Sequence, residues 1–592
     1  MKVLLSILFF SSLSYLINAQ DLLYNKSIHQ TQLEYYNSFD STSATYYENS
    51  SSSYNKTVTS KSSCNLNKVV YGWHPYWGGS TYQNYQWELL SHFSFFCYEV
   101  DPSDGEPITT HGWSTSDAVD SALASGNTKV TLTVTLFSNH STFFSSTTNQ
   151  QTLISNLINL VQSRGAHGVN IDFEGLPSAY KIDFAYFMVN LANQMHAAIP
   201  NSEISTVLYA VDWNDVFDFT LMEPAVDQYI IMGYAYYYQG SSNSGPCDPL
   251  YHFGSSYNYT LSKSITYYLD KGCPSEKLIL GLPYYGYEWS TATSSIPSST
   301  TSSGLAKTFT QVMNNTYGNY SQANHQYDHD SYSDVYVFVD STIYKQCFIT
   351  LEDGFRKRLE HVNVSGIGGI GIWALGYDNG YNEFWNAIND YLTDCYIDSC
   401  THSIHDFGGP NKDYYDNEDY IWTIAPDSAT YLDIDFTSFD LESNYDYLYI
   451  YNGPDTSYTQ IQGSPFTGTN SPGNFVATNG SVTFRFYSDV ATTNPGFIAN
   501  YQCYYTPYVG VEESSKIELS IYPNPSSKTI NIENNSYNDS KLYIYNSYGK
   551  VIESYELYNR SRIKVDISEF SNGIYFIKLN NSQKVYNFVV NK

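Results

Sequence analysis

A chain of 592 residues is too long for one ordinary hydrophobic core, so its length predicts three or four domains. Hydrophobic residues make up 42% of the chain, enough to form such cores, and 61 residues are tyrosine. The formal net charge of −30 argues against nucleic acid and anionic membranes as partners, because both bind to clustered Lys and Arg. A neutral polysaccharide and hard cations such as calcium are compatible with this charge. The tyrosines suit stacking on sugars, although AT-rich coding would produce the same excess.

The N-terminus has the pattern of a secretory signal peptide. A basic start at Lys2 precedes an apolar run over residues 3–17 that serines interrupt, and a small Ala19 follows. The run is too short and broken for a membrane anchor, and no later segment reaches about 18 to 20 consecutive apolar residues. We therefore expect residues 1–19 to be a signal peptide and the protein to be exported. Residues 20–66 are rich in Ser, Thr, Asn and Tyr without periodicity, which predicts a disordered linker.

Eight cysteines in an exported chain are compatible with disulfide bonds. Their spacing contains no CxxC pair and no Cys/His pattern, which argues against a zinc site. Cys247 and Cys273 are candidates for one bridge, whereas Cys97 lies inside an apolar strand and is equally consistent with a buried free thiol.

From Val69 onward, short apolar strands alternate with helical patterns. The helical spacing is clearest over residues 153–161 and 184–195. Near-continuous apolar strands are typical of a parallel sheet buried on both faces, and eight of them with intervening helices predict a (β/α)8 TIM barrel over residues 67–392. The stretch from Ser290 to about Lys357 is interpreted as an insertion before the last strand. The eight strands are VVYGWHPYW (69–77), HFSFFCYEV (92–100), KVTLTVTLF (129–137), GVNIDFE (168–174), ISTVLYAV (204–211), YIIMGYAYY (229–237), LILGLPYYGY (278–287) and IGGIGIWALGY (367–377).

The strand over residues 167–174 carries the chemistry. Side chains alternate faces along a strand, so Asn170, Asp172 and Glu174 share one face. A polar row that ends in Glu at the C-terminal end of a barrel strand points to the usual active-site mouth. We predict that Glu174 is the general acid and that the like charge of Asp172 raises its pKa. The alternative is a polar strand end with satisfied hydrogen bonds, which would be costly to bury for structure alone.

This segment resembles the D-x-x-D-x-D-x-E signature of glycoside hydrolase family 18, the chitinase family. Residues 232–234 (Met-Gly-Tyr) are similar to the M-x-Y-D strand of that family, and residues 281–286 match its next strand. Residues 371–378 resemble its last strand, whose Trp forms the floor of the subsite for the cleaved sugar. The four motifs occur in order, one per expected strand, and the resemblance covers most of residues 68–392.

The resemblance implies a retaining, substrate-assisted mechanism. Glu174 would protonate the glycosidic oxygen, Asp172 would orient the 2-acetamido group of the substrate, and Tyr234 would hydrogen-bond to it. This chemistry requires an N-acetyl group, so the implied substrates are β-1,4-linked N-acetylglucosamine polymers such as chitin, and no cofactor is implied for catalysis. The substrate-binding residues that we predict are Asn170, Met232, Tyr236, Trp289 and Trp373.

The sequence departs from the family pattern at three positions. His167 and Asn170 stand where the signature has acidic residues, and Ala235 replaces the aspartate of M-x-Y-D. These departures predict activity that is weakened or shifted in pH. They leave open a non-catalytic, lectin-like chitin or glycan binder, and within enzymes an endo-β-N-acetylglucosaminidase or a peptidoglycan hydrolase.

Residues 395–505 predict a β-sandwich, because segments such as YLDIDF (431–436), YDYLYIY (445–451) and SVTFRFY (481–487) alternate between turn residues. This region resembles a CUB domain at residues 406–409, 422–426, 439–442, 445–448 and 496–501. Calcium-binding members of that family imply Glu442, Asp446 and Asp489 as ligands, and oxygen ligands suit this cation. A solvated acidic loop is the alternative.

Residues 517–592 predict a second, smaller β-sandwich. Three stretches, residues 521–525, 548–550 and 572–576, resemble the C-terminal sorting domain of type IX secretion cargo. The resemblance implies that the type IX machinery is a partner. It also implies passage across an outer membrane, followed by release or attachment at the cell surface.

Overall fold

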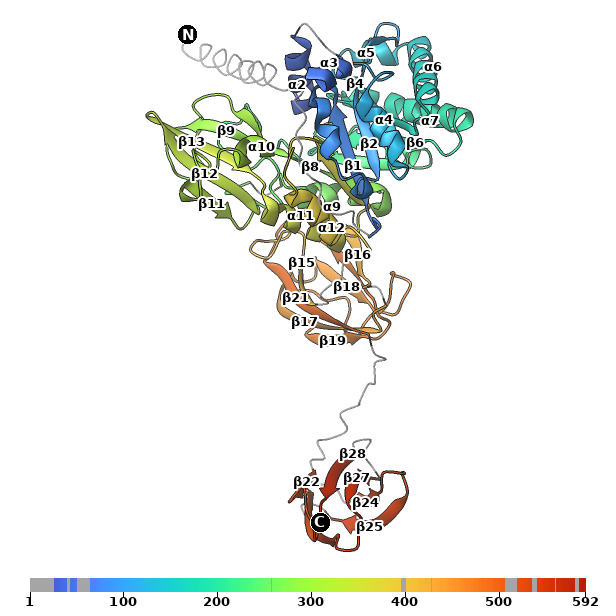
Figure 1. The fold of residues 1–592 in the computed structure, drawn as a ribbon, viewed down its shortest axis with the longest axis vertical. Helices are drawn as coiled ribbons and strands as arrows, with labels where there is room; N and C mark the ends of the chain where they lie inside the picture. The colour runs from blue at the N-terminus through green and yellow to red at the C-terminus, as the bar shows by residue number, and fades with distance from the viewer. Residues whose placement is uncertain are drawn as a thin grey trace, which may run out of the picture. The chain divides into compact units, whose positions relative to one another are not determined.

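The computed structural model describes residues 26–39, 43–50, 64–256, 258–394, 401–426, 428–505, 519–534, 540–558, 561–580 and 585–592 (Figure 1). The chain divides into two compact units, one up to Thr506 and one from Pro507 onward. The predicted signal peptide lies outside the described residues. Within these ranges, no helix has the length and apolar character needed to cross a membrane.

The first unit contains the predicted TIM barrel. Eight parallel strands form one sheet, and β1 closes it by pairing with both β14 and β2. The short antiparallel β3 (Pro107–Thr109) extends β2 at the rim. The strands are buried along almost their entire length, as expected for parallel strands covered on both faces. In order around the barrel they are β1 (Val69–Pro75), β14 (Gly369–Trp373), β8 (Leu278–Pro283), β7 (Gln228–Met232), β6 (Glu203–Leu208), β5 (Gly168–Phe173), β4 (Lys129–Leu136) and β2 (His92–Val100).

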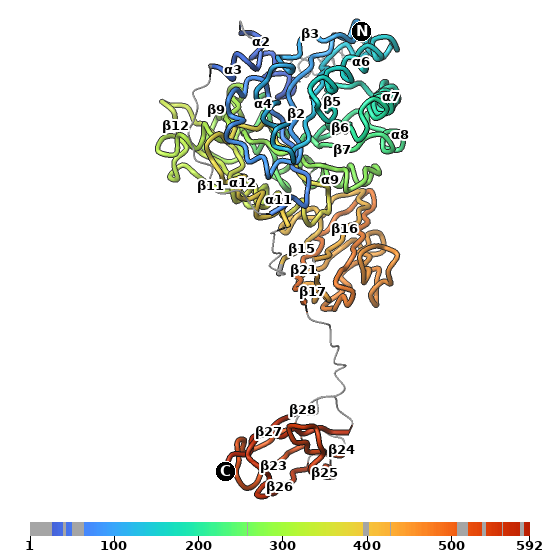
Figure 2. Tube along the Cα trace, turned by 45° about the vertical axis from the view of Figure 1, so that its right-hand side comes forward, coloured from blue at the N-terminus to red at the C-terminus, as the bar shows by residue number. Residues whose placement is uncertain are grey.

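Helices lie around the outside of these strands (Figure 2). The spacing predicted over residues 153–161 belongs to α6, which starts at the N-cap Ser146 and stops at Gly165, whose φ is 66°. Such a left-handed conformation favours glycine and ends the helix. The barrel helices are α4 (Asp117–Ser125), α5 (His140–Phe144), α6 (Thr147–Arg164), α7 (Lys181–Ala198), α8 (Phe219–Met222), α9 (Leu261–Asp270), α11 (Glu352–Val364) and α12 (Glu383–Tyr391), with 3-10 turns η1 (Tyr76–Asn84), η2 (Trp87–Leu89), η3 (Ser178–Tyr180) and η4 (Ser275–Lys277).

The predicted insertion is a five-stranded antiparallel sheet. It begins at Tyr285, before the predicted Ser290, because the chain passes from β8 into the new sheet with only Tyr284 between them. Its elements are β9 (Tyr285–Thr291), β10 (Leu305–Thr308), α10 (Phe309–Met313), η5 (Gln322–Asn324), β11 (His325–Asp328), β12 (Ser333–Asp340) and β13 (Ile343–Ile349).

The predicted sandwich follows the barrel within the same unit. One sheet has the order β15-β21-β17-β19 and the other β16-β20-β18. It rests on α9 of the barrel, where Ser262 Oγ donates to the Phe407 carbonyl over 2.5 Å and Thr260 Oγ1 lies 2.8 Å from Tyr415 Oη. The strands are β15 (Thr401–His405), β16 (Asp419–Ile424), β17 (Tyr431–Asp440), β18 (Tyr447–Tyr451), β19 (Asn474–Ala477), β20 (Val482–Tyr487) and β21 (Gly496–Tyr504).

The second unit is a small β-sandwich with its own core of buried residues, among them Ile532, Leu542 and Phe588. Its two sheets have the orders β22-β23-β26 and β25-β24-β27-β28. The strands are β22 (Leu519–Tyr522), β23 (Thr529–Asn534), β24 (Ser540–Tyr545), β25 (Val551–Leu557), β26 (Arg562–Asp566), β27 (Gly573–Leu579) and β28 (Val585–Val590).

Two expectations about the chain are wrong. Cys247 and Cys273 do not pair, because both are buried free thiols, as is Cys97. Residues 20–66 are not a disordered linker throughout, because α2 (Ile28–Asn37) and α3 (Ala44–Ser50) lie within this segment. The segment is polar in composition, but Ile28, Leu33 and Ala44 are buried in the same core as the barrel, and Ala44 is completely buried.

Candidate active site

The predicted acid lies at the C-terminal end of β5. Asn170 and Asp172 point into the barrel and are buried, and Glu174 follows the strand with only 8% of its surface exposed. The Glu174 amide donates to the Leu136 carbonyl of β4, which fixes its backbone at the strand end. The three polar side chains therefore line one wall of the barrel, as the alternation predicts.

Asn170 has both halves of its amide satisfied inside the barrel. Its Oδ1 accepts from Trp73 Nε1 over 3.0 Å, and its Nδ2 donates to Ser205 Oγ over 2.9 Å. An amide at this position supplies one donor and one acceptor to neutral partners, whereas a carboxylate would leave a buried charge facing a hydroxyl. Asn170 is thus built into the core of this barrel, below the reacting groups.

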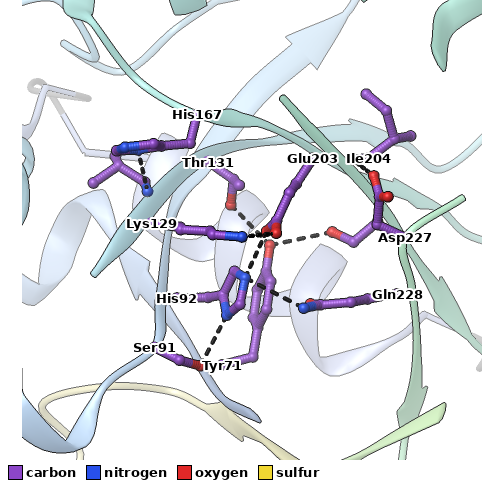
Figure 3. Close-up of polar contacts among 12 residues, drawn as sticks. Tyr71, Ser91, His92, Lys129, Thr131, His167, Glu203, Ile204, Asp227 and Gln228 are labelled. Carbon is purple, nitrogen blue, oxygen red and sulfur yellow. Dashed lines mark hydrogen bonds and ion pairs between the residues drawn. The ribbon is translucent and has the colours of Figure 1, made fainter. Parts of the chain in front are cut away.

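His167 directly precedes β5 and Glu174 directly follows it, so the two residues lie at opposite ends of this strand. Its Nδ1 accepts from the Val130 amide over 2.9 Å. Nearby, His92 Nε2 lies 2.6 Å from Glu203 Oε2 in the polar network that Figure 3 shows. Seven residues of extended strand span about 23 Å, so His167 is too distant to tune the proton affinity of Glu174. The effect on activity that the departure at His167 predicts stays a prediction, and it would not act through direct contact with the acid.

Tyr234 enters the site from the loop after β7, and it is 3% exposed. Met232, at the end of that strand, and Ala235 line a cavity of about 370 Å³ that Glu174 also borders. Ala235 has a φ of 62°, so the backbone turns sharply where the family pattern has an aspartate. The position at which the family pattern has an aspartate therefore lies in the wall of the cavity that Glu174 also borders.

The aromatic residues predicted to bind sugar take different places. Trp373, at the end of β14, is fully buried. Tyr236 borders the cavity of about 370 Å³, with its hydroxyl 2.5 Å from Ser264 Oγ. Trp289 is fully buried in β9 against Tyr287, with ring centroids 5.5 Å apart. It belongs to the core that includes the barrel residues, and its role in sugar binding stays a prediction.

From the sequence, Trp213 is one of several aromatic residues at strand ends that could line a cleft, but it is not among the predicted substrate-binding residues. In the structure it is 73% exposed. It lines both cavities next to Glu174, of about 390 and 370 Å³. Tyr209 and Tyr238 border the same two cavities. The signal was the position of Trp213 just beyond the strand over residues 204–211, but it was one aromatic residue among many.

Sequence reasoning also missed residues of α2 that reach into the site. His29 Nδ1 lies 3.0 Å from both Asp172 Oδ2 and Glu174 Oε1, and its Nε2 lies 2.9 Å from Tyr234 Oη. Ser27 Oγ donates to Glu174 Oε1 over 2.9 Å. One imidazole thus contacts all three predicted catalytic side chains, which proves that they converge.

The electrostatics of this group follow from its burial. Burial and the charge of Asp172 raise the pKa of Glu174 above its usual range, although His29 and Ser27 offset part of that rise. Burial alone would lower the pKa of His29, but the charges of Asp172 and Glu174 and the hydrogen bonds to them raise it to about 9. Burial also holds the pKa of Tyr234 well above its usual range. The site therefore keeps the pKa of Glu174 above its usual range and favours a positive charge where His29 lies.

The residues predicted to hold calcium also converge. Glu442, Asp446 and Asp489 of the sandwich each offer an oxygen, and these atoms lie within 4.8 Å of one another. The Asp489 amide donates to Asp446 Oδ1 over 2.9 Å, and the Tyr414 hydroxyl donates to Asp446 Oδ2. The all-oxygen donor set fits a hard cation, and these hydrogen bonds fix the orientation of Asp446.

The closed barrel with a buried acid at the C-terminal end of a strand defines a glycosidase. A model of glycosyl hydrolases family 18 matches residues 42–378, more than half of the chain, and the chain belongs to this family. A CUB domain matches residues 395–501, and a secretion system C-terminal sorting domain matches residues 520–591. The three predicted resemblances are confirmed in their order, and the sorting domain indicates secretion to the cell surface or the exterior.

Individual relatives match parts of the chain. Chitotriosidase-1 of Mus musculus is 22% identical over 263 residues, 40% of this chain and 55% of that protein. A probable endochitinase of Caenorhabditis elegans is 28% identical over 255 residues, 40% of each chain. A putative sporulation-specific glycosylase, YdhD of Bacillus subtilis, is 28% identical over 149 residues, 24% of this chain and 32% of that protein. The matches thus span a third to about half of these relatives.

Solved structures of chitinases resemble the chain over about half of its length. The Group IV chitinase of Ostrinia furnacalis has a TM-score of 0.49 at 17% identity, and it covers 55% of this chain and 99% of its own. The class V chitinase of Nicotiana tobaccum has a TM-score of 0.49 at 16% identity with the same coverage.

Proposed function

We propose that this protein hydrolyses β-1,4-linked N-acetylglucosamine polymers, chitin or its oligomers, by a retaining, substrate-assisted mechanism. The observation that carries the proposal is the convergence of Glu174, Asp172 and Tyr234, all within 3.0 Å of one imidazole ring. A buried carboxyl with a raised pKa keeps its proton to higher pH than a free carboxyl does, as a general acid requires.

In the first step, the acetamido carbonyl oxygen of the substrate attacks the anomeric carbon while the bond to the glycosidic oxygen breaks. Glu174 gives its proton to that oxygen, and the sugar is left as a cyclic oxazolinium ion. Asp172 orients the acetamido nitrogen and stabilises its positive charge. The Tyr234 hydroxyl donates a hydrogen bond to the former carbonyl oxygen of the acetamido group, which is now part of the oxazolinium ring. In the second step, the Glu174 carboxylate takes a proton from water, and the water oxygen attacks the anomeric carbon. The bond from this carbon to the oxazolinium oxygen breaks, which restores the acetamido group and gives net retention.

Two kinds of observation support the substrate class. The named relatives include chitinases, and the proposed chemistry requires a 2-acetamido group. Peptidoglycan is the second candidate, because its N-acetylglucosamine units also carry the 2-acetamido group that the proposed chemistry requires. A lectin-like binder is disfavoured because the acid, the orienting aspartate and Tyr234 are all present. Secretion by the type IX machinery would deliver the enzyme to polymers outside the cell.

The test is Glu174→Gln, assayed on chitin oligomers, peptidoglycan and glycoprotein glycans. Both the parent and a His29→Ala background are needed, because His29 contacts Glu174. Loss of the acid should lower turnover by about 10² to 10⁴ with thermal unfolding unchanged. Glu276→Gln, on the turn before β8 at the other end of the barrel, is the matched control and should keep full turnover. Unchanged turnover in Glu174→Gln would exclude Glu174 as the acid.

A further inference from the structure

We propose that residues 26–50, here called the inhibitory segment, are an internal ligand of the sugar site that keeps the enzyme latent until the segment is displaced. The proposal rests on the proposed function, because the occupied site is the one assigned to the cleaved sugar. It concerns α2 and α3, both of which lie beyond the expected signal peptide and therefore remain in the exported chain.

His29 takes the place that a sugar needs. Its ring lies on Trp373 with centroids 3.9 Å apart and an angle of 41° between the planes, and it contacts Phe96 edge-on at 5.7 Å. The side chain is completely buried. An N-acetylglucosamine ring on the same tryptophan, with its acetamido group on Asp172 and Tyr234, would overlap His29. Glycan and segment must therefore exclude each other at this subsite.

His29 also resembles the proposed intermediate in chemistry. An imidazolium is a planar, cationic, five-membered ring with an N–H donor, as is an oxazolinium ion. One side of the His29 ring faces Asp172 and the other faces the Tyr234 hydroxyl, which are the partners assigned to the acetamido nitrogen and oxygen. In the proposed reaction the site stabilises such a cation, so the segment binds through the same contacts with Asp172 and Tyr234 that the intermediate would make.

Neighbouring side chains of the segment satisfy the other polar groups of the site. The Ser27 hydroxyl donates to Glu174, as a hydroxyl of a bound sugar could. The same hydroxyl caps α2 by accepting from the Gln30 amide. Gln32 Oε1 accepts from Trp373 Nε1 over 3.1 Å. The acid and the floor tryptophan are thus both occupied by residues of one helical turn and its cap.

Further along α2, the segment covers the rim of the barrel. Tyr36 stacks on Trp77 with centroids 4.5 Å apart and planes 9° apart. Asn37 bridges two rim residues, because it accepts from the Tyr76 hydroxyl and donates to Glu99 Oε1, each over 2.9 Å. Stacking of this kind is also how clefts bind sugar rings, so the segment occupies aromatic surface that suits a glycan.

The helix α3 fastens the segment at a second place. Glu48 is 9% exposed, and its carboxylate accepts from Ser116 Oγ and from the amides of Asp117 and Ala118, at 2.7 to 3.1 Å. These amides are the first donors of α4, where a carboxylate is stabilised by the helix dipole. A ten-residue helix such as α2 has little stability alone in water, so its order depends on these contacts.

The segment leaves one side of the cleft open. Cavities of about 390 and 370 Å³ lie next to Ser27 and Ile28, and Glu174 and Trp213 border both. A glycan chain can therefore bind beside the segment before it competes for the subsite at Trp373. Displacement by the polymer itself is consistent with this arrangement, and it links activity to the presence of substrate.

The experiment measures segment release and glycan binding separately from hydrolysis. In the Glu174→Gln chain, amide hydrogen exchange reports α2, and calorimetry with a chitin oligomer reports affinity. We expect His29→Ala to increase exchange in α2 and to tighten oligomer binding about tenfold or more, because affinity scales with the open fraction. In the Glu174→Gln chain that keeps His29, a saturating concentration of the oligomer should increase amide exchange in α2. Asn49→Ala, an exposed position of α3 that bonds within its own helix, is the control and should change neither.

Hydrolysis is then compared in chains that retain Glu174. Faster turnover in His29→Ala and in Glu48→Ala than in the parent supports latency. Equal oligomer affinity with and without His29, and no effect of oligomer on α2 exchange, would overturn it, even if every chain hydrolyses chitin. Tighter binding without hydrolysis in any chain would instead refute the proposed function and leave the internal ligand standing. A synthetic peptide of residues 26–50 should inhibit His29→Ala in trans; failure to inhibit at millimolar peptide also counts against the proposal.

Discussion

The charge on His29 makes a quantitative prediction about pH. The groups that face the imidazole are Asp172 and Glu174 from β5 and Tyr234 from the loop after β7, while Phe96 and Trp373 contribute only rings. The docked imidazolium has a pKa of about 9, against 6.5 for a free histidine. By linkage, that difference stabilises the docked segment by about 3 kcal/mol, a factor of a few hundred, when His29 is protonated in both states.

The direction of the pH dependence follows from the raised pKa of His29 in the docked segment. The stabilisation is complete below about pH 6.5, declines as pH rises between 6.5 and 9, and is lost above about 9. The open fraction should therefore increase over this range. The assay is the ratio of kcat/KM in His29→Ala to that in the parent, measured from pH 5 to 9. Ionisation of Glu174 in the open site is common to both chains and cancels in the ratio.

We expect this ratio to be largest below pH 6.5 and to fall by up to about tenfold per pH unit above it. His29→Gln is the matched control, because it keeps a polar side chain that does not titrate, and its ratio to His29→Ala should not vary with pH. A parent ratio that is flat or that rises with pH would refute the charge argument, whatever the size of the latency.

Three further predictions concern other parts of the chain. Ala235→Asp should raise the pKa of Glu174 by like charge and extend activity by about one pH unit to the alkaline side, about 1.4 kcal/mol, whereas the neutral Ala235→Asn should leave the pH profile unchanged. Calcium at a hundredfold excess over its Kd should stabilise the CUB domain by about 2.7 kcal/mol in a thermal melt, and Asp489→Asn should abolish that gain; a melt insensitive to calcium and EGTA would exclude the site. Deleting residues 517–592 should leave the first unit folded and retain it in the periplasm, and normal appearance outside the cell would contradict the sorting role.

The barrel was predictable because its strands are buried on both faces and read as continuous apolar runs, such as IIM at the end of β7. The site strand was predictable because alternation places Asp172 and Glu174 on one face. The inserted sheet was recognised only as an insertion, because its short antiparallel strands are half polar. The surroundings of Trp289 were not predictable for the same reason, because its place depends on the pairing of β9 with β13, which no local pattern reveals.

The inhibitory segment was missed because its order comes from distant contacts and not from its own composition. His29 pairs with residues 143 and 205 positions away, and Gln32 with one 341 positions away. Local propensity in a polar segment predicts disorder when it cannot bury apolar surface, and here a preformed cleft supplies the missing partner.

The same contacts explain how two neighbouring carboxyl groups are accommodated in a buried site. Asp172 and Glu174 are almost completely buried, and Asp172 Oδ1 has no hydrogen-bond partner among the described residues. Buried charges of one sign are costly unless a counter-charge accompanies them. In the docked state His29 is that counter-charge, and in the proposed reaction the oxazolinium ion is. Two buried carboxylates favour a bound cation even when no substrate is present. A segment that presents an imidazolium ring on the floor tryptophan therefore both relieves that repulsion and withholds the acid from any glycan that has not yet displaced it.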